Sequence, residues 1–295
     1  MKLVNKTTPY YDDALEAAEY VKAGETVRFD APDCWGNRLT ADITKGDLYA
    51  MGLEMNPCCG PVWVEDAMPG DTLKITVEDI QVKDGHLAVY REEFGVLGSY
   101  LDRNETMEVP IADGTALLHD GKFRLPIRPM LGVLAVTPPG ERRSTLLSGT
   151  YGGNMDCNLI GKGAVVYLPV QVPGAKVITG DVHALQGDGE VLASLETPAE
   201  ITLKIELLKG RAEQWPVLET DNAWYVITSA LTSSDANTLA LSAMADFLTR
   251  RKQYSSLEWL TLMGLVGNAQ NCKVVDTYKT SRFMMPKSVT GGLSF

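Results

Sequence analysis

The chain has 295 residues, 45% of them apolar and 22% charged, and its 27 Lys and Arg side chains are outnumbered by 38 Asp and Glu. The net charge of −11 argues against a nucleic-acid partner, because phosphate binding needs clustered basic side chains. The best candidate for a membrane span, residues 164–172, is short and contains a proline, so we expect no membrane partner.

The first residues, MKLVNKTTPYYDDALEAAEY, lack the apolar core of a signal peptide. The five cysteines are odd in number and include no CxxC pair. This usage disfavours a disulfide framework and a cysteine zinc site, so we expect a reduced protein in the cytoplasm.

Strand patterns dominate from about residue 25 to residue 227. Apolar and polar residues alternate over 201–207, and again over 73–77 after a Pro-Gly-Asp turn, as in strands with one buried face. Short apolar runs bounded by Gly or Pro, at 131–136, 164–172 and 175–178, are typical of strands buried on both faces. The pattern predicts a mainly β protein with a β-sandwich or barrel body.

Helical patterns gather near the end of the chain. Ser234 can cap a helix over 235–251, which ends in basic residues that favour the negative end of its dipole. Ser255 and Glu258 have the spacing of a capping box, and the helix they open ends near 264–267. A strand over 273–278 follows. We predict a mainly β body over residues 1–219, carrying the active site, and an α+β part with two helices over 220–295.

Two polar segments early in the body are candidates for chemistry. In residues 30–37, Asp33 follows a strand and can point into a cavity, or it can bond its own backbone in a turn. In residues 56–71, Trp63 and Glu65 share one face of a strand. A Glu beside an indole can have the raised pKa of a general base, but an exposed strand face is the simpler explanation.

The strongest candidate is the segment GDVHALQGDGE over 180–190. Asp181 and His183 are two residues apart, so on a strand they point to the same face, and the Asp-Gly turn that follows can bring Glu190 back toward them. Imidazole with carboxylates suits zinc, carboxylates alone suit calcium or magnesium, and the same trio can serve as an acid and base set. A core histidine satisfied by Asp181 is the structural alternative.

The glycine-rich segment 148–158 lacks the spacing of a phosphate-binding loop, and we expect it to bring Asn154 and Asp156 to a site. The other histidines, His86 and His119, are expected at the surface or in turns. A Cys–His pair that uses His183 is formally available. Free cysteines are commonly inert, so we rank this pair below water activated by a metal or a carboxylate.

Taken in order, these segments resemble the acetamidase/formamidase family. The matching motifs are Asp33 in a loop ending in Gly36, NPxxGPVxVExAxPGD over 56–71, MLGV over 130–133, GGNMD over 152–156 and GDVHALQGDGE over 180–190. The resemblance runs from about residue 27 to residue 286. It implies a mainly β enzyme that hydrolyses the C–N bond of small linear amides to ammonia and a carboxylate.

The resemblance also implies a bound divalent metal, zinc or calcium, and a homodimer. By motif, the functional positions are Asp33, Glu65, Asp156, Asp181, His183 and Glu190. We expect the metal to be held by His183 with some of Asp33, Asp156, Asp181 and Glu190. The catalytic positions are Glu65, Asp33, His183 and Asn154. Glu65 or another nearby carboxylate moves the proton of the attacking water, and Asn154 stabilises the oxyanion.

Two alternatives stay open. One is a hydrolase that acts on a different amide. The other is a non-catalytic small-molecule-binding protein on the same scaffold with a structural calcium ion. The histidine of the strongest segment disfavours the second alternative, because a purely structural calcium site has no use for imidazole.

Overall fold

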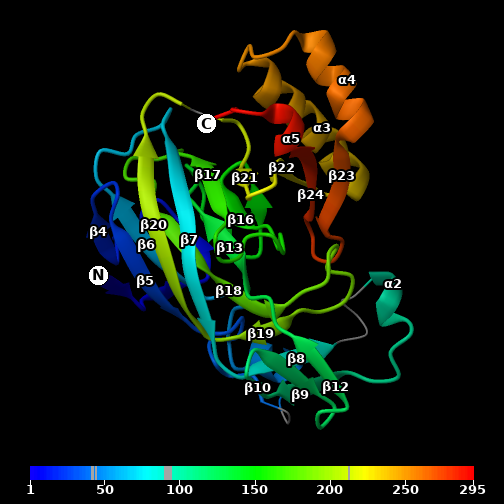
Figure 1. Ribbon diagram of the computed structural model, residues 1–295. Coiled ribbons are helices and arrows are strands. Elements are labelled where there is room, and N and C mark those ends of the chain that lie inside the picture. Colours follow the sequence, from blue (N-terminus) through cyan, green and yellow to red (C-terminus); the bar gives the residue numbers. More distant parts are fainter. Residues whose placement is uncertain (41–42, 44, 90–94, 212) are drawn as a thin grey trace.

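The computed structural model describes residues 1–40, 43, 45–89, 95–211 and 213–295. Two large β-sheets form the body, and helices near the C-terminus cover one end of the first sheet (Figure 1). The helices are α1 (Lys45–Ala50), α2 (Gly95–Gly98), α3 (Ser233–Thr249), α4 (Ser256–Val266) and α5 (Lys287–Thr290). None of these described helices is long and apolar enough to span a membrane.

The first sheet has nine strands within the described ranges. In spatial order they are β1 (Lys2–Val4), β5 (Thr26–Ala31), β20 (Ala199–Leu208), β7 (Thr72–Val82), β17 (Val165–Pro169), β21 (Val217–Glu219), β22 (Ala223–Ala230), β24 (Lys279–Pro286) and β23 (Asn268–Lys273). The alternation over 201–207 is confirmed, because Ile201, Leu203 and Ile205 of β20 are buried and the residues between them are partly exposed.

The second sheet carries the polar segments. Its strands are β15 (Ser148–Gly149), β16 (Gly152–Asn154), β13 (Met130–Ala135), β18 (Val177–Leu185), β19 (Leu195–Thr197), β8 (Gly85–Val89) and β9 (Glu105–Val109). In addition, β6 (Cys58–Val64) pairs with β18, and β2 (Thr7–Thr8) and β4 (Glu19–Val21) pair with β6. Every residue of β13 is buried, as predicted for a strand covered on both faces. The central strand β18 pairs with β6 along its first half and with β19 along its second half.

Small sheets complete the fold. They are formed by β10 (Ile111–Ala112), β11 (Thr115–Leu118) and β12 (Phe123–Pro126), and by β14 (Arg143–Ser144) with β3 (Tyr10–Tyr11).

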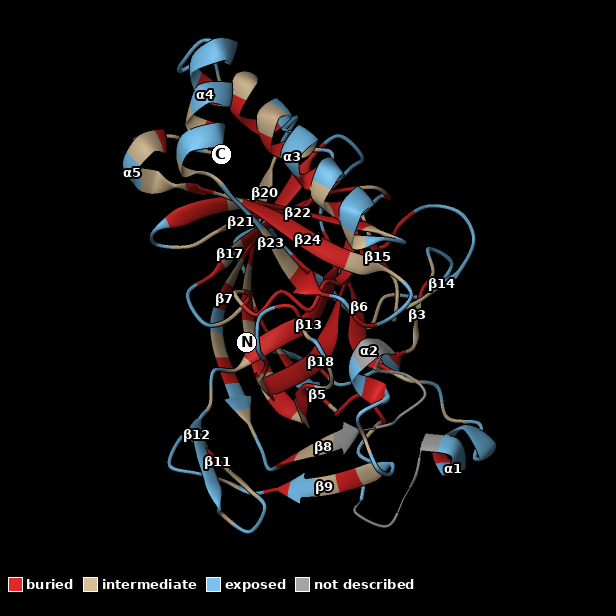
Figure 2. Ribbon diagram, turned by 90° about the vertical axis from the view of Figure 1, so that its right-hand side faces the viewer, coloured by how far each residue is buried: buried red, intermediate tan, exposed pale blue. Residues whose placement is uncertain are grey.

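The two largest apolar cores of the described residues hold the layers together. The first lies between the large sheets and includes Phe29 from one sheet and Leu131 from the other. The second lies between the opposite face of the first sheet and the helices α3 and α4, and it includes Trp224 and Trp259. Figure 2 shows the resulting contrast between buried strands and the exposed outer faces of the helices. Each fully buried side chain of this size contributes roughly 1.5–3 kcal/mol.

The mainly β architecture with helices in the C-terminal part is confirmed, and both predicted long helices form. The N-cap of α3 is Thr232 rather than Ser234, because the Thr232 hydroxyl accepts from the backbone N–H of Asp235 at 3.1 Å. The capping box of Ser255 and Glu258 opens α4 as predicted. The division of the chain at 219/220 stays a prediction, since residues 220–295 also contribute β22, β23 and β24 to the first sheet.

The strand predicted over 273–278 is wrong. β23 ends at Lys273, and residues 274–278 form the turn that leads to β24. The turn meets the loop that follows β18, where the N–H of Val274 donates to the carbonyl of Gly189 at 2.8 Å. The C-terminal part of the chain thus reaches the predicted site.

Candidate active site

A buried polar cluster lies where β18 changes its partner from β6 to β19. Asp156, Asp181 and His183 each place one ligand atom within 4.8 Å of the others, and we call them the Asp–His cluster. Two of them stand on β18, and Asp156 follows β16. Because β13 pairs with both strands, it brings these segments together as expected from the sequence.

Gly132 of β13 makes room for the two carboxylates of the Asp–His cluster. A Cβ atom at this position would lie 2.6 Å from Asp156 Oδ1 and 2.6 Å from Asp181 Oδ2. These distances are shorter than any ordinary van der Waals contact, so a side chain at Gly132 would push the carboxylates apart. The glycine of the MLGV motif therefore sets the spacing of the cluster.

The backbone is strained at the site. Asp156, Asp181 and Glu190 have φ values of 44°, 53° and 33°, in the left-handed region that non-glycine residues rarely adopt. Such a conformation costs about 1–3 kcal/mol per residue and persists only where the surroundings impose it. At Asp156 the surroundings are backbone hydrogen bonds to the carbonyl of Gly132, from Met155 at 3.0 Å and Asp156 at 3.2 Å. Such conformations also occur elsewhere among the described residues, but these three lie at one buried polar cluster, and strained backbone is typical of functional sites.

The hydrogen bonds of Gln186 fix a proton on His183. Gln186 Nε2 donates to the carbonyl of Asp156 at 2.7 Å and to a second backbone carbonyl at 3.4 Å, so its Oε1 is an acceptor. This oxygen lies 2.8 Å from His183 Nδ1, which therefore carries the proton. The other ring nitrogen, Nε2, lies 3.3 Å from Glu196 Oε1 and 3.7 Å from Asp181 Oδ1. Nε2 thus faces carboxylates and suits a shared proton or a cation.

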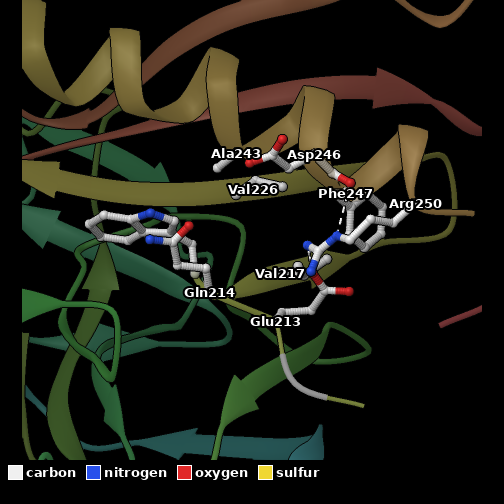
Figure 3. Close-up of a pocket in the computed structure, with 9 residues that line it drawn as sticks. Glu213, Gln214, Val217, Val226, Ala243, Asp246, Phe247 and Arg250 are labelled. Atoms are coloured by element: carbon white, nitrogen blue, oxygen red, sulfur yellow. Dashed lines mark hydrogen bonds and ion pairs between the residues drawn. The ribbon is translucent and has the colours of Figure 1, made fainter. Parts of the chain in front are cut away.

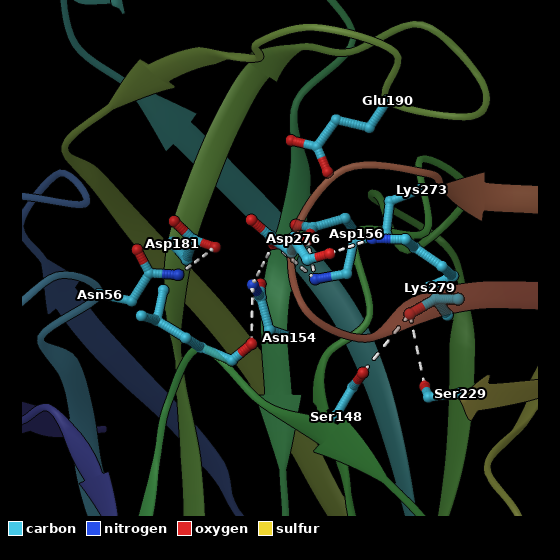
Figure 4. A network of polar contacts seen from close by, with 12 residues as sticks. Asn56, Ser148, Asn154, Asp156, Asp181, Glu190, Ser229, Lys273, Asp276 and Lys279 are labelled. Atoms are coloured by element: carbon cyan, nitrogen blue, oxygen red, sulfur yellow. Dashed lines mark hydrogen bonds and ion pairs between the residues drawn. The ribbon is translucent and has the colours of Figure 1, made fainter. Parts of the chain in front are cut away.

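Buried oxygen atoms without a hydrogen-bond donor gather in and next to the cluster. Within the described part of the chain they are Asp33 Oδ2, Asn56 Oδ1, Asn154 Oδ1, Asp156 Oδ1, Glu190 Oε2 and Glu196 Oε2. Other polar atoms of these side chains are paired. For example, Asn56 Nδ2 donates to Asp181 Oδ2 at 2.8 Å (Figure 4). Buried acceptors normally have donors, so a set of acceptors alone fits a cation or a ligand rich in N–H groups.

Lys273 adds a buried ammonium to the cluster. Its Nζ lies 2.9 Å from Asp156 Oδ2 and 2.9 Å from Asp276 Oδ2, and Asp276 also accepts from Asn154 Nδ2 at 3.3 Å (Figure 4). Asp156 therefore directs one oxygen to the ammonium and the other toward His183. The carboxylates around Lys273 and His183 outnumber these two basic side chains, so a further positive charge would balance the charge of the cluster.

Burial dominates the protonation of the carboxylates. It raises the pKa of Glu196 to about 7, although the charge of His183 opposes the shift. Burial, reinforced by the charge of Asp156, raises the pKa of Glu190 well above its usual value. Burial lowers the pKa of His183, but Glu196 and the other carboxylates outweigh it, so this pKa lies well above the ordinary one. The cluster therefore holds protons that a bound cation would displace.

The other predicted residues have different surroundings. Asp33 is buried, and its Oδ1 accepts from the backbone N–H groups of Trp35 and Asn37, both at 2.8 Å. The turn alternative is thus realised for one oxygen, while the second has no donor. Glu65 is exposed in the turn after β6, which ends at Val64, so the strand face predicted to be shared by Trp63 and Glu65 is wrong. Asn154 is buried beside Asp276.

Sequence reasoning missed several residues of the site. Glu196 stands directly opposite His183 across the β18–β19 pair, and Lys273 is buried at the end of β23. A lysine inside the apolar run 272–275 was an available signal for a buried cation. His86 lies on β8 opposite Glu196 with a buried Nδ1, so its expected place at the surface or in a turn is wrong, whereas His119 lies in a turn as predicted.

Four of the five cysteines give no support to a thiolate nucleophile, because their pKa values are raised. All five are free and buried. Burial, reinforced by nearby carboxylates, raises the pKa of Cys34 and Cys58 well above the usual value. Burial also opposes ionisation of Cys157, but hydrogen bonding from Cys272 and the charge of Arg282 outweigh it and lower its pKa to about 6. That sulfur is engaged by Arg282 Nη1 at 3.5 Å.

A separate cavity of about 120 Å³ lies between α3 and residues 213–217 (Figure 3). It shares no lining residue with the Asp–His cluster. Glu213 on its wall is paired with Arg250 and Arg251. Two arginines therefore pair with this carboxylate, in contrast to the buried carboxylates with unpaired oxygens at the cluster.

Comparison with known proteins agrees with the motifs. A family model described as the acetamidase/formamidase family matches residues 5–141 and 135–282. The crystal structure of an acetamidase from Bacillus halodurans is similar with a TM-score of 0.93 and 33% identity, over 99% of this chain and 100% of that one. A predicted acetamidase/formamidase from Thermoanaerobacter tengcongensis has a TM-score of 0.92 and 33% identity, over 100% of this chain and 99% of that one.

A curated relative is more distant. The formamidase of Methylophilus methylotrophus is 24% identical over 257 residues, which cover 67% of this chain and 63% of the relative. The match thus spans less than two thirds of that protein. The family model, by contrast, covers nearly the whole chain, including every segment of the site. The chain belongs to the acetamidase/formamidase family.

Proposed function

We propose that this protein hydrolyses the C–N bond of small linear amides, such as formamide or acetamide, to ammonia and a carboxylate, with a bound divalent metal. Its family and its likeness over the whole chain to the Bacillus halodurans acetamidase support the reaction class. The observation that supports the metal is the Asp–His cluster, together with the buried oxygens without donors in and next to it.

The donor set fits a divalent cation. His183 Nε2, Asp156 Oδ1 and a carboxylate oxygen of Asp181 would hold it, with Asp33 and Glu190 as further ligands. One imidazole with carboxylates suits zinc, and a larger share of oxygen ligands suits calcium. The metal would supply Lewis acidity that polarises the amide carbonyl.

The chain's own carboxylates would move the proton. Glu190 and Glu196 each have a buried oxygen without a donor and a raised pKa, as a base for water at neutral pH requires. The sequence-based hypothesis named Glu65 or another nearby carboxylate, and the exposure of Glu65 favours the nearby ones. Glu190 or Glu196 would then pass the proton to the leaving ammonia.

Asn154 stays our proposed stabiliser of the oxyanion. Its Nδ2 donates to Asp276 at 3.3 Å and would turn toward the substrate when the reaction develops negative charge. Its unpaired Oδ1 suits the N–H groups of a primary amide.

Ammonia release from formamide, acetamide, propionamide and benzamide by the purified protein tests this proposal, with H183A as the inactive reference. We expect turnover of the smallest amides by the wild-type protein. Turnover confined to a larger amide would shift the substrate to the first alternative. Tight calcium binding with no turnover of any amide would overturn the enzymatic function in favour of a binding protein.

We also propose a homodimer and a cytoplasmic location. α4 is largely apolar, yet it exposes Leu257, Leu260 and Leu265, and a second copy of this chain is the partner that we expect on this face. Light scattering after size-exclusion chromatography should give twice the 32.1 kDa chain mass, and L257E/L265E should give the monomer. A wild-type monomer would contradict the dimer. The five free cysteines fit a reducing compartment.

A further inference from the structure

Arg282 lies outside the Asp–His cluster but contacts the segments that carry it. This residue of β24 is buried, with 3% of its surface exposed. Its Nη2 donates to Asp188 Oδ2 at 2.7 Å, and its Nη1 to Asn158 Oδ1 at 3.4 Å. Its Nε donates to Gln270 Oε1 of β23 at 2.7 Å. One planar guanidinium thus connects the loop after β18, the segment after β16 and the β23–β24 pair.

The first arm of Arg282 ends two residues before Glu190. The loop is a tight turn, in which the N–H of Glu190 donates to the carbonyl of Gly187 at 3.2 Å, and Glu190 has a φ of 33°. Ser194 Oγ holds Glu190 Oε1 at 2.8 Å, while Oε2 remains buried without a donor. Such a strained conformation persists only when the surroundings impose it.

The second arm ends two residues after Asp156. Asn158, its acceptor, lies in the segment that leaves the cluster, and Asp156 also has a left-handed φ of 44°. The same Nη1 approaches Cys157 Sγ at 3.5 Å. The guanidinium therefore hydrogen-bonds to both segments that carry a strained carboxylate residue. In each segment its partner lies two residues along the chain from the carboxylate that would hold the metal.

Burying a guanidinium is costly unless its donors are satisfied. A surface arginine would pair with the half-exposed Asp188 at less cost, so the buried position needs a reason beyond that ion pair. The contacts indicate a geometric reason, because the rigid planar guanidinium of Arg282 fixes the distance between the two segments.

We propose that Arg282 is a positioning residue that sets Glu190 against Asp156 through Asp188 and Asn158. The proposal rests on the proposed function for its catalytic readout, but the position of the loop can be measured without activity. Arg282 touches neither substrate nor reacting atoms. Its effect passes through the two segments that it holds.

The test compares R282Q, R282K, D188N and the double variant R282Q/D188N with R250Q. R250Q is the matched control, because Arg250 pairs with Glu213 at the far end of α3. R282Q and D188N should keep the circular dichroism of the wild type and lower kcat by about 10- to 100-fold, as loss of residues supporting a site does. KM should change far less. The double variant should be no worse than R282Q, because both changes remove the same link.

A second readout does not depend on turnover. Hydrogen–deuterium exchange at residues 187–191 and 157–159 should rise in R282Q and stay unchanged in R250Q. R282K should restore the link to Asp188 alone. Its hydrogen–deuterium exchange should therefore return to the wild-type level at residues 187–191 but stay raised at 157–159. Unchanged exchange and kcat in R282Q, or fully additive losses in the double variant, would overturn the proposal. Absence of wild-type turnover would refute the proposed function, while exchange would still decide the role of Arg282.

Discussion

The segments over 56–71 and 180–190 are both rich in glycine and carboxylates, but Asp71 of the first and Glu190 of the second have opposite surroundings. In the first, buried Asp71 accepts from the N–H groups of Met68 and Gly210, both at 2.9 Å, and from Lys209 Nζ at 2.6 Å. In the second, Glu190 is strained and keeps a buried oxygen without a donor. Carboxylates whose hydrogen bonds are complete stabilise a turn. Buried carboxylate oxygens without donors on a strained backbone are available to bind a ligand or move a proton.

The largest expected effect is that of removing the imidazole from the second segment. H183A should lose bound metal and amide turnover together, because Nε2 lies among the carboxylates that would hold the cation. Elemental analysis and ammonia release measure the two effects. Full metal content with full turnover in H183A would show that the second segment does not hold a catalytic metal.

The next test separates the carboxylates of the two segments. E190Q and E196Q should each lower kcat by roughly 10²- to 10⁴-fold, the range for loss of a general base, if that residue moves the proton. E65Q should leave kcat near the wild-type value, since this side chain is exposed. A loss in E65Q alone would reverse the assignment and return the base to the first segment.

A third test changes the spacing of the carboxylates without removing them. G132A should lower metal affinity about 10- to 100-fold, because its Cβ would displace Asp156 and Asp181. G264A is the matched control: nothing lies within 4 Å of its added Cβ in α4, and stability should change by about 1 kcal/mol or less. Calorimetric metal titration measures the difference, and equal affinities in the two variants would disprove the role of Gly132.

The smallest effect concerns Asp71, whose role should be purely structural. Burial tends to raise its pKa, but Lys209 and two backbone donors outweigh burial and lower it. The stabilisation should be complete above the unfolded-state pKa of about 4 and should vanish as the pH falls through the lower folded-state pKa. D71N should therefore cost about 1.5–3 kcal/mol near neutral pH and almost nothing in strong acid.

Thermal unfolding of wild type and D71N across the pH range measures this effect. Amide turnover by the folded variant should stay near the wild-type value. A constant stability difference down to the lowest pH, or a selective loss of turnover, would give Asp71 another role.

Much of the fold could be predicted from local pattern. Strict alternation in β20 and the fully apolar run of β13 reflect burial on one face or two, which sequence records directly. The strand predicted over 273–278 failed because two adjacent valines do not distinguish a strand from a turn with one buried valine. Here the turn packs against the loop that carries Glu190.

The site was predictable where chemistry lies within one segment and unpredictable where it arises between segments. Asp181 and His183 share a strand, so their spacing alone brings them together. Glu196 reaches His183 only through the register of β18 and β19, and Lys273 reaches Asp156 only through the turn after β23. Gly132 has no chemistry of its own, and its role follows from one carboxylate on β18 and another in the segment after β16.

Metal-dependent ammonia release tests the proposed metal site most directly. The wild-type protein should lose amide turnover on chelation and regain it in proportion to the zinc or calcium that it rebinds, with no recovery in H183A. Full turnover by a protein that elemental analysis finds free of metal would contradict the central claim that the unpaired oxygens around His183 hold a cation.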